Sequence, residues 1–243
     1  MSRMSRLLGV ALLLGALPAR AGDGRVPILL ELFTSEGCSS CPPADAVLAR
    51  LVREQPVKNV EIVGLSEHVD YWDSLGWRDP YSSAQFTERQ QTYASVLGRG
   101  DVYTPQAVVD GHADVVGSDE GGIRRASSAA AEKAHGTIEV RADGRKVHLA
   151  ATLPPHGDAD VFLAAVDDPP PSHVQRGENA GRTLSHVHVV RALKRVARVD
   201  QPTWSTDIEL EPAFQRLRLV AFVQERGTRR VLAAGSWVPA AGL

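Results

Sequence analysis

Two cysteines stand three positions apart in the segment Cys38-Ser39-Ser40-Cys41, and the chain contains no others. A pair with this spacing can cycle between a dithiol and a disulfide, because one thiolate attacks a substrate disulfide and the second thiol resolves the mixed disulfide. With no third cysteine, turnover requires an external thiol–disulfide redox partner, either a small thiol or a polypeptide client. The pair therefore predicts thiol–disulfide exchange without a separate cofactor.

The pair lies where a predicted buried strand gives way to a predicted helix. Ile28 to Phe33 is a nearly continuous apolar run, typical of a strand buried on both faces, and a helical pattern begins at Pro42. A thiol at a helix N-terminus faces unsatisfied amide groups and the positive end of the helix dipole, which favour the thiolate. We expect Cys38, in an exposed first turn, to be the nucleophile and Cys41, one turn deeper, to be the resolving thiol.

Two other interpretations of the pair stay open. An inert, structural disulfide would make the chain a non-catalytic interaction protein, although a four-residue ring stabilises a fold by at most about 1.9 kcal/mol. A periplasmic copper carrier would use Cys38, Cys41 and His68 as three soft or borderline ligands. A structural zinc site is disfavoured because it needs four ligands and the chain has no third cysteine.

Side chains from a second strand are expected to meet the dithiol. Val60 to Leu65 follows the helix as another apolar strand, and a strand–helix–strand succession implies parallel neighbours. Sites form at the carboxyl edge of such sheets, so His68 and Asp70 should lie near Cys38. His68 would tune the thiolate or move a proton, with a hydrogen-bonded histidine that fixes the loop as the alternative.

Aromatic side chains follow directly. Tyr71, Trp72 and Trp77 would form an apolar lip for an unfolded polypeptide, or they would pack the core of an inserted segment.

The sequence pattern of the rest of the chain changes near residue 136. Residues 72–100 are predicted to be a partly helical insert, followed by a strand pair around the turn Asp110-Gly111 and an Ala-rich helix at about 119–134. Beyond Gly136, short alternating strands predict an all-β sandwich: 137–141, 146–152, 160–166, 217–224 and 230–237. Residues 184–199 fit a strand or a helix. As a strand they would place His186 and His188 on one face, with His173 nearby, although solvated strand histidines are commoner than metal sites.

The first 21 residues have the pattern of a signal peptide. Arg3 and Arg6 precede an apolar run that is too short to span a bilayer, and Ala19-Arg20-Ala21 suits cleavage after about Ala21. A buried N-terminal helix or a membrane anchor is the alternative. Cleavage would leave a periplasmic or secreted protein with no membrane span in the mature chain.

Composition limits the partners. The 243 residues include 27 Lys and Arg against 29 Asp and Glu, for a formal net charge of −2. This near-neutral charge gives no indication that the protein binds nucleic acid or an anionic membrane surface.

Two segments resemble known redox proteins. Leu32 to Pro42 resembles the strand-to-active-site segment of thioredoxins and glutaredoxins, and Thr104-Pro105 resembles their cis-proline. The resemblance implies that Pro105 and Thr104 belong to the catalytic site and dock a partner strand. A trans Pro105 on an edge strand is the alternative.

A longer resemblance covers nearly the whole mature chain. It is to a family of secreted thioredoxin-like proteins known as domain of unknown function 1223, and it rests on Glu31–Ala44, His68–Asp73, Gly76-Trp77, Val102–Gln106 and Gly177–Leu184. Thioredoxins carry a buried acid ahead of the dithiol, for which Glu31 is an approximate counterpart. Glu31 would relay the proton of Cys41 or would pair with an arginine at the sheet edge. For Gly177–Leu184 we expect a turn in which Arg182 pairs at a domain interface.

These observations predict an exported protein with two domains: an α/β thioredoxin-like domain at 22–135 with its insert, and an all-β sandwich-like domain at 136–243. The predicted function is thiol–disulfide exchange on protein or small-thiol partners.

Overall fold

Two apolar segments form parallel strands inside a large sheet. The computed structural model describes residues 24–239, so the predicted signal peptide lies outside the described residues. Strand β1 (Val26–Thr34) pairs in parallel with β2 (Val60–His68), and helix α1 (Pro42–Glu54) connects them. Strand β3 (Gln106–Val109) pairs antiparallel with β1, and β4 (Ala113–Val116) pairs with β3. These elements match the predicted strand–helix–strand unit and the hairpin at Asp110-Gly111.

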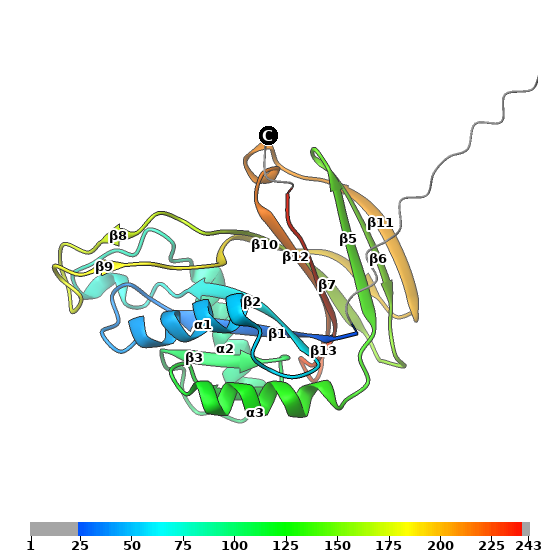
Figure 1. Cartoon of the computed structure of the whole chain (residues 1–243), viewed down its shortest axis with the longest axis horizontal. Coiled ribbons are helices and arrows are strands. Elements are labelled where there is room, and N and C mark those ends of the chain that lie inside the picture. The colour runs from blue at the N-terminus through cyan, green and yellow to red at the C-terminus, as the bar shows by residue number, and fades with distance from the viewer. Residues whose placement is uncertain (1–23, 240–243) are drawn as a thin grey trace, which may run out of the picture.

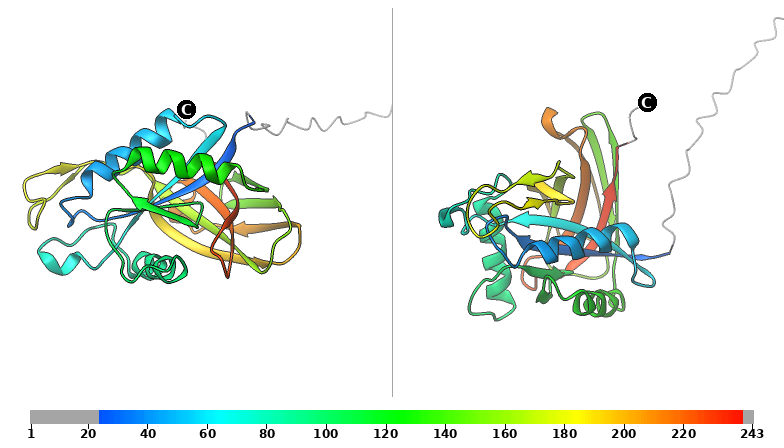
Figure 2. Two further views of the ribbon diagram at one scale, coloured as in Figure 1. Left: turned by 90° about the horizontal axis from the view of Figure 1, so that it is seen from below. Right: turned by 60° about the vertical axis from the view of Figure 1, so that its left-hand side comes forward.

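Successive side chains of β1 point to opposite faces of this sheet, and different helices cover the two faces. Leu30 and Leu32 point to the face covered by α1 and α3 (Glu120–Ala131), where they share a core with Leu48 and Ile123. Leu29 points to the other face, where it packs with Phe86 of α2 (Ala84–Val96). Figure 2 shows α1 and α3 on one side of the sheet and α2 on the other. The predicted insert thus contains α2, together with the short helix η1 (Asp73–Leu75).

Strands from the second half of the chain extend the same sheet. The segment that fitted a strand or a helix is strand β10 (Val189–Val199), and its first residue pairs in parallel with Ser66 of β2. Beyond β10 lie β7 (Ala159–Asp167), β12 (Arg218–Glu225) and β13 (Val231–Trp237), which gives an eight-stranded sheet in the order β13-β12-β7-β10-β2-β1-β3-β4. The division near residue 136 therefore does not separate two independent sheets.

A smaller sheet covers one end of the large one. It contains β5 (Thr137–Asp143), β6 (Lys146–Thr152) and β11 (Thr203–Glu209), the last of which was not predicted. Inward residues such as Val147 and Leu149 share a core with Val161 and Leu219 of the large sheet. The short helix η2 (Pro212–Phe214) follows β11. This end has the sandwich-like packing predicted for the second half (Figure 1).

A hairpin arm projects from the opposite end of the molecule. Strands β8 (Ser172–His173) and β9 (Thr183–Leu184) pair with each other alone and lie beside the loop that precedes α1 (Figure 1). We call residues 172–184 the arm. The described chain is thus a mixed α/β protein dominated by β-structure, with three α-helices in residues 24–239. Within the same range, no helix is both long and apolar enough to span a membrane.

Candidate functional site

Cys38 and Cys41 are joined in a disulfide at the start of α1, with their Cα atoms 5.4 Å apart. Cys41 is the residue immediately before the helix, and Pro42 and Pro43 occupy its first positions. Proline suits this turn because it has no N–H group to leave unsatisfied there. The loop Ser35 to Cys41 therefore carries the disulfide from the end of β1 onto the N-terminus of α1, as predicted.

Both cysteines are fully buried, which corrects the expectation that Cys38 is exposed. Each has a relative exposure of 0%, whereas Ser39 and Ser40 between them are exposed. Neighbouring segments close in on the loop: a Cβ added at Gly37 would lie 3.0 Å from the Cβ of Trp72, and the arm hydrogen-bonds to the loop from another side. Ser40 Oγ lies 3.3 Å from Cys38 Sγ.

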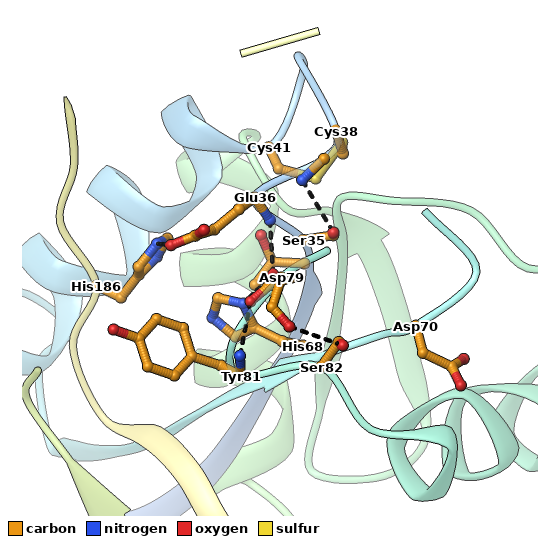
Figure 3. Close-up of polar contacts among 12 residues, drawn as sticks. Ser35, Glu36, Cys38, Cys41, His68, Asp70, Asp79, Tyr81, Ser82 and His186 are labelled. Carbon is orange, nitrogen blue, oxygen red and sulfur yellow. Dashed lines mark hydrogen bonds and ion pairs between the residues drawn. A yellow bond between two sulfur atoms is a disulfide. The ribbon is translucent and has the colours of Figure 1, made fainter. Parts of the chain in front are cut away.

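Five buried titratable side chains lie close to this loop: Glu36, Asp45, His68, Asp79 and His186. We call them the histidine cluster; Figure 3 shows Glu36, His68, Asp79 and His186 of this cluster. His68 Nδ1 lies 2.7 Å from Asp79 Oδ2, and the same oxygen accepts the N–H of Glu36 at 2.7 Å. His186 Nε2 lies 3.3 Å from Glu36 Oε1, and its Nδ1 lies 3.7 Å from Asp45 Oδ2. The cluster links β2, α1, the insert and the segment after the arm.

Burial and pairing shift the protonation of the cluster. Burial raises the pKa of Asp45 above its ordinary value, against the lowering effect of His186 and His68. Burial alone would lower the pKa of His186, but its hydrogen bond to Glu36 and the charge of Asp45 leave that pKa raised. Burial would raise the pKa of Asp79, but His68 outweighs it and the pKa is lowered. The pKa values beside the disulfide are therefore shifted in different directions, raised for Asp45 and His186 and lowered for Asp79.

Two nitrogens of the cluster have no hydrogen-bond partner among the described residues. They are His68 Nε2 and His186 Nδ1, and both are buried. The rings of these histidines lie edge to face, with centroids 4.8 Å apart.

His68 is thus near the loop, as predicted, but its recorded hydrogen bond is to Asp79 rather than to a sulfur. Asp70 points away from the cluster (Figure 3). Its backbone N–H donates to Thr87 Oγ1 at 3.1 Å, and its carboxylate accepts from the same hydroxyl at 2.6 Å. Of these two predicted tuning residues, His68 belongs to the cluster, whereas Asp70 is hydrogen-bonded to the first turn of α2.

The predicted aromatic residues surround the loop in different ways. Trp72 lies against Gly37, and its Nε1 donates to Thr104 Oγ1 at 2.8 Å. Trp77 Nε1 donates to Glu36 Oε2 at 2.7 Å, which anchors the insert on the histidine cluster. The hydroxyl of Tyr71 donates to Gln90 Oε1 at 3.2 Å. All three rings are partly buried, so they pack the insert as well as bordering the site.

The Thr104–Pro105 peptide bond is cis, in agreement with the resemblance-based prediction. Pro105 lies beside the first turn of α1, since a Cβ added at Gly117 would lie 3.0 Å from the Cβ atoms of both Ala44 and Pro105. Pro105 thus lies near the turn of α1 that follows the disulfide.

Glu31 lies on the other face of the sheet, away from α1. Its carboxylate accepts hydrogen bonds from Arg89 and Tyr93 of α2, and Arg89 also bonds to Gln224 of β12. Of the two roles considered for Glu31, the arginine pair is present, in the interior of the protein rather than at the sheet edge. We call Glu31, Glu67, Arg89, Tyr93 and Gln224 the arginine cluster.

Asp45 is a buried acid one turn after Cys41, and the sequence analysis missed it. Thr34 Oγ1 donates to Asp45 Oδ1 at 2.9 Å, and Thr34 is the last residue of β1 on the face that α1 covers. A signal was present in the sequence: Cys41, Asp45 and Leu48 are spaced to share one face of a helix.

The candidate metal ligands do not come together in this structure. Cys38 and Cys41 are bonded to each other, and His68 is bonded to Asp79. His188 Nδ1 lies 3.0 Å from the carbonyl oxygen of Gly64, and His173 Nδ1 lies 2.8 Å from Thr183 Oγ1, apart from His186. In the part of the chain that the structure describes, no group of three or more His, Cys, Asp or Glu side chains is arranged to hold a metal ion.

The arm contributes contacts to the loop that the sequence analysis did not predict. Arg182 Nη1 donates to Asn179 Oδ1 at 2.8 Å and so fixes the turn. Asn179 Nδ2 in turn donates to the carbonyl oxygens of Glu36 and Cys38, at 2.8 and 2.9 Å. The contact surface is the disulfide loop itself rather than a general domain interface.

The chain is similar to a family and to solved structures. A family described as "Protein of unknown function (DUF1223)" matches residues 29–224. The crystal structure of protein AGR_C_4864 from Agrobacterium tumefaciens is similar with a TM-score of 0.77 and 28% identity, covering 90% of this chain and 97% of that chain. That of hypothetical protein PH1083 from Pyrococcus horikoshii OT3 has a TM-score of 0.22 and 9% identity, covers 43% of this chain and 85% of that chain, and supports no argument. No curated protein matches the chain significantly.

Proposed function

The chain belongs to the DUF1223 family, and we propose that it is a thiol–disulfide oxidoreductase that works through Cys38 and Cys41. The observation that carries the proposal is the position of the disulfide. It lies at the N-terminus of α1, where amide groups and the helix dipole favour a thiolate, beside buried acids and histidines that can exchange a proton. In this proposal residues 22–135 act as a thioredoxin-like redox unit and residues 136–243 as a sandwich-like unit that completes its site.

The reaction moves two electrons between the cysteine pair and a partner. In the reducing direction, the Cys38 thiolate attacks a partner disulfide, a mixed disulfide forms, and one partner thiolate leaves and takes up a proton. The Cys41 thiolate then attacks Cys38 Sγ, which closes the Cys38–Cys41 disulfide and releases the second partner thiol. The oxidising direction reverses each step.

The histidine cluster supplies the proton acceptor for Cys41. Asp45 follows Cys41 by one turn of α1, and its N–H donates to the Cys41 carbonyl at 3.1 Å. With its raised pKa, the Asp45 carboxyl can hold a proton and pass it to His186. Neither residue forms a bond to substrate, so their role is to position and exchange the proton.

The partner binds beside Thr104 and Pro105, where Trp72 covers the loop. Because both cysteines are buried, exchange requires the Trp72–Thr104 contact or the arm to open. Trp72, with Tyr71 and Trp77 behind it, then presents apolar surface to a polypeptide client. We place this reaction in the periplasm or outside the cell, after removal of the signal peptide, where a disulfide persists.

One observation favours a second function. Full burial of both sulfurs is also what a non-catalytic binding protein with an inert disulfide would have, because structural disulfides are shielded from thiols. In that case the redox chemistry is absent and function lies on the rest of the surface.

The reduction potential decides between the two. We would equilibrate the metal-free mature protein in glutathione buffers and trap free thiols. A potential of roughly −120 to −270 mV is expected for an oxidoreductase. A potential below about −300 mV would identify a structural disulfide and overturn the proposal.

A further inference from the structure

The arm places a carboxylate directly on the disulfide loop. Glu178 Oε2 accepts the backbone N–H of Ser39 at 3.0 Å. Its side chain is otherwise exposed, and the hydrogen bonds from the Ser39 side chain and backbone lower the pKa of Glu178 below its ordinary value. Glu178 therefore carries a full negative charge at neutral pH.

The position of this charge is set by its neighbour. Asn179 is fully buried and donates to two carbonyl oxygens of the loop, those of Glu36 and Cys38. Arg182 holds the amide oxygen of Asn179. The nitrogen that Glu178 binds is attached to the carbonyl carbon of Cys38, so the carboxylate is held one residue from the sulfur.

Other charged groups also face the loop. From α1, β2, the insert and the segment after the arm come the histidine-cluster residues Asp45, His68, Asp79 and His186, and Glu36 belongs to the loop itself. Their charges are paired with one another beneath the disulfide. On the arm, the positive charge of Arg182 is directed to Asn179. The carboxylate of Glu178 accepts a hydrogen bond from the loop backbone, and it forms no ion pair within residues 24–239.

A thiolate that forms on Cys38 therefore meets two unfavourable effects. Glu178 repels it as a like charge. The N–H of Ser39, which would otherwise be available to the thiolate at this end of the helix, is already donated to Glu178.

We propose that Glu178 is a positioning residue that opposes the Cys38 thiolate and shifts the equilibrium of the cysteine pair toward the disulfide. This inference rests on the proposed function and deepens it: the second half of the chain sets the oxidising strength of a site carried by the first half. The arm then makes the pair a weaker oxidant than the helix N-terminus alone would make it.

Glu178→Gln tests this with little change in shape, because the amide oxygen can still accept the Ser39 N–H. We would measure the pKa of Cys38 in the reduced protein from the pH dependence of alkylation, and the equilibrium constant for reduction of the disulfide by glutathione. In Glu178→Gln the Cys38 pKa should fall by roughly half a unit to one unit. Reduction should become up to about tenfold more favourable, which is about 30 mV.

Two further variants separate charge from structure. Glu178→Lys should shift both quantities further in the same direction, which a loss of packing would not do. Glu139→Gln, which neutralises a partly exposed carboxylate on β5, should leave both unchanged. Salt should shrink the Glu178→Gln effect because the side chain is exposed.

Specific outcomes would overturn the inference. An unchanged pKa and equilibrium constant in Glu178→Gln and Glu178→Lys would remove the electrostatic role. Faster exchange at an unchanged equilibrium would mean that Glu178 merely covers the loop. If the wild-type potential lies below about −300 mV, the proposed function fails, yet the Cys38 pKa of the chemically reduced variants still decides the role of Glu178.

Discussion

The protein buries two clusters of charged side chains on opposite faces of one sheet, and the two are compensated differently. On the α2 face, Glu31 and Glu67 lie against Arg89, whose guanidinium also stacks near the rings of Phe162 and Phe222. On the α1 face and beside the disulfide, three carboxyl groups are matched by two histidines, His68 and His186. One cluster has a permanent cation, the guanidinium of Arg89, and in the other the basic groups are imidazoles.

The two clusters should therefore respond differently to pH. Burial and the neighbouring Glu31 raise the pKa of Glu67 well above its ordinary value, while Glu31 pairs with Arg89. Burial opposes the charge of Arg89, but Glu31, Tyr93 and Glu67 raise its pKa still higher. Arg89 therefore stays charged beside Glu31, whereas the raised pKa of His186 makes the charge of the histidine cluster depend on pH.

The largest effect should follow from breaking the arginine cluster. Arg89→Met leaves Glu31 buried without its cation, so the free energy of unfolding should fall by about 3–5 kcal/mol. Urea denaturation would measure this loss. The reduction potential should stay that of the wild type, because the change lies on the other face of the sheet.

Two comparisons sharpen this prediction. The double variant Glu31→Gln with Arg89→Met should regain part of the loss, because no uncompensated carboxylate remains. Lys194→Met, which breaks the exposed pair with Glu211, should cost at most about 1 kcal/mol. A loss in Arg89→Met no larger than that of Lys194→Met would refute the stabilising role of Arg89.

A smaller, pH-dependent loss is expected from the histidine cluster. His186→Gln removes the proton that His186 can share with Glu36, and a buried acceptor left unsatisfied costs about 1–3 kcal/mol. The folded-state pKa of His186 is raised, so its stabilisation is complete below the ordinary value of 6.5 and is lost as pH rises through the folded-state pKa. The stability difference between wild type and variant should therefore narrow on going to alkaline pH. A difference that is constant or widens would show that His186 does not bind a proton in this way.

The smallest effect should come from Asp45→Asn, with the opposite sign. Because the pKa of Asp45 is raised in the folded protein, ionisation favours the unfolded chain as pH rises above the ordinary value of 3.8. The asparagine variant should thus gain stability relative to wild type with increasing pH, by an amount of the order of one hydrogen bond, about 1 kcal/mol. Unfolding curves at several pH values would measure it, with the exposed Asp143→Asn as the control that should show no such trend.

Local sequence patterns were sufficient for the elements that carry the disulfide. The apolar run of β1, the prolines at the start of α1 and the apolar run of β2 each specify their element within a few residues. Position at the edge of the sheet follows from this order, which is why His68 was correctly expected near the loop.

Contacts between segments far apart in the sequence could not be predicted from such local patterns. The arm reaches the loop from Glu178 and Asn179, and β10 joins β2 at Ser66, through pairings that leave no periodic signal in either segment. The burial of Cys38 was missed for this reason, because it depends on those segments. The face of Glu31 was missed for another: in a strand buried on both sides, the apolar pattern does not say which side each residue faces.

The edge of β2 has a consequence for any shortened form of the protein. Near its start the edge is covered by Gln55, whose side-chain amide exchanges hydrogen bonds with the backbone of Ile62 at 2.7 and 3.0 Å. Near its end it is covered by the carbonyl of His188, which accepts the N–H of Ser66 at 2.9 Å. A fragment ending at residue 135 would keep the contacts of Gln55 and lose that of His188, which would expose unpaired backbone close to the two cysteines. Such a fragment would aggregate rather than serve as a minimal redox module, and a ribosome making the chain faces the same exposed edge until the second half emerges.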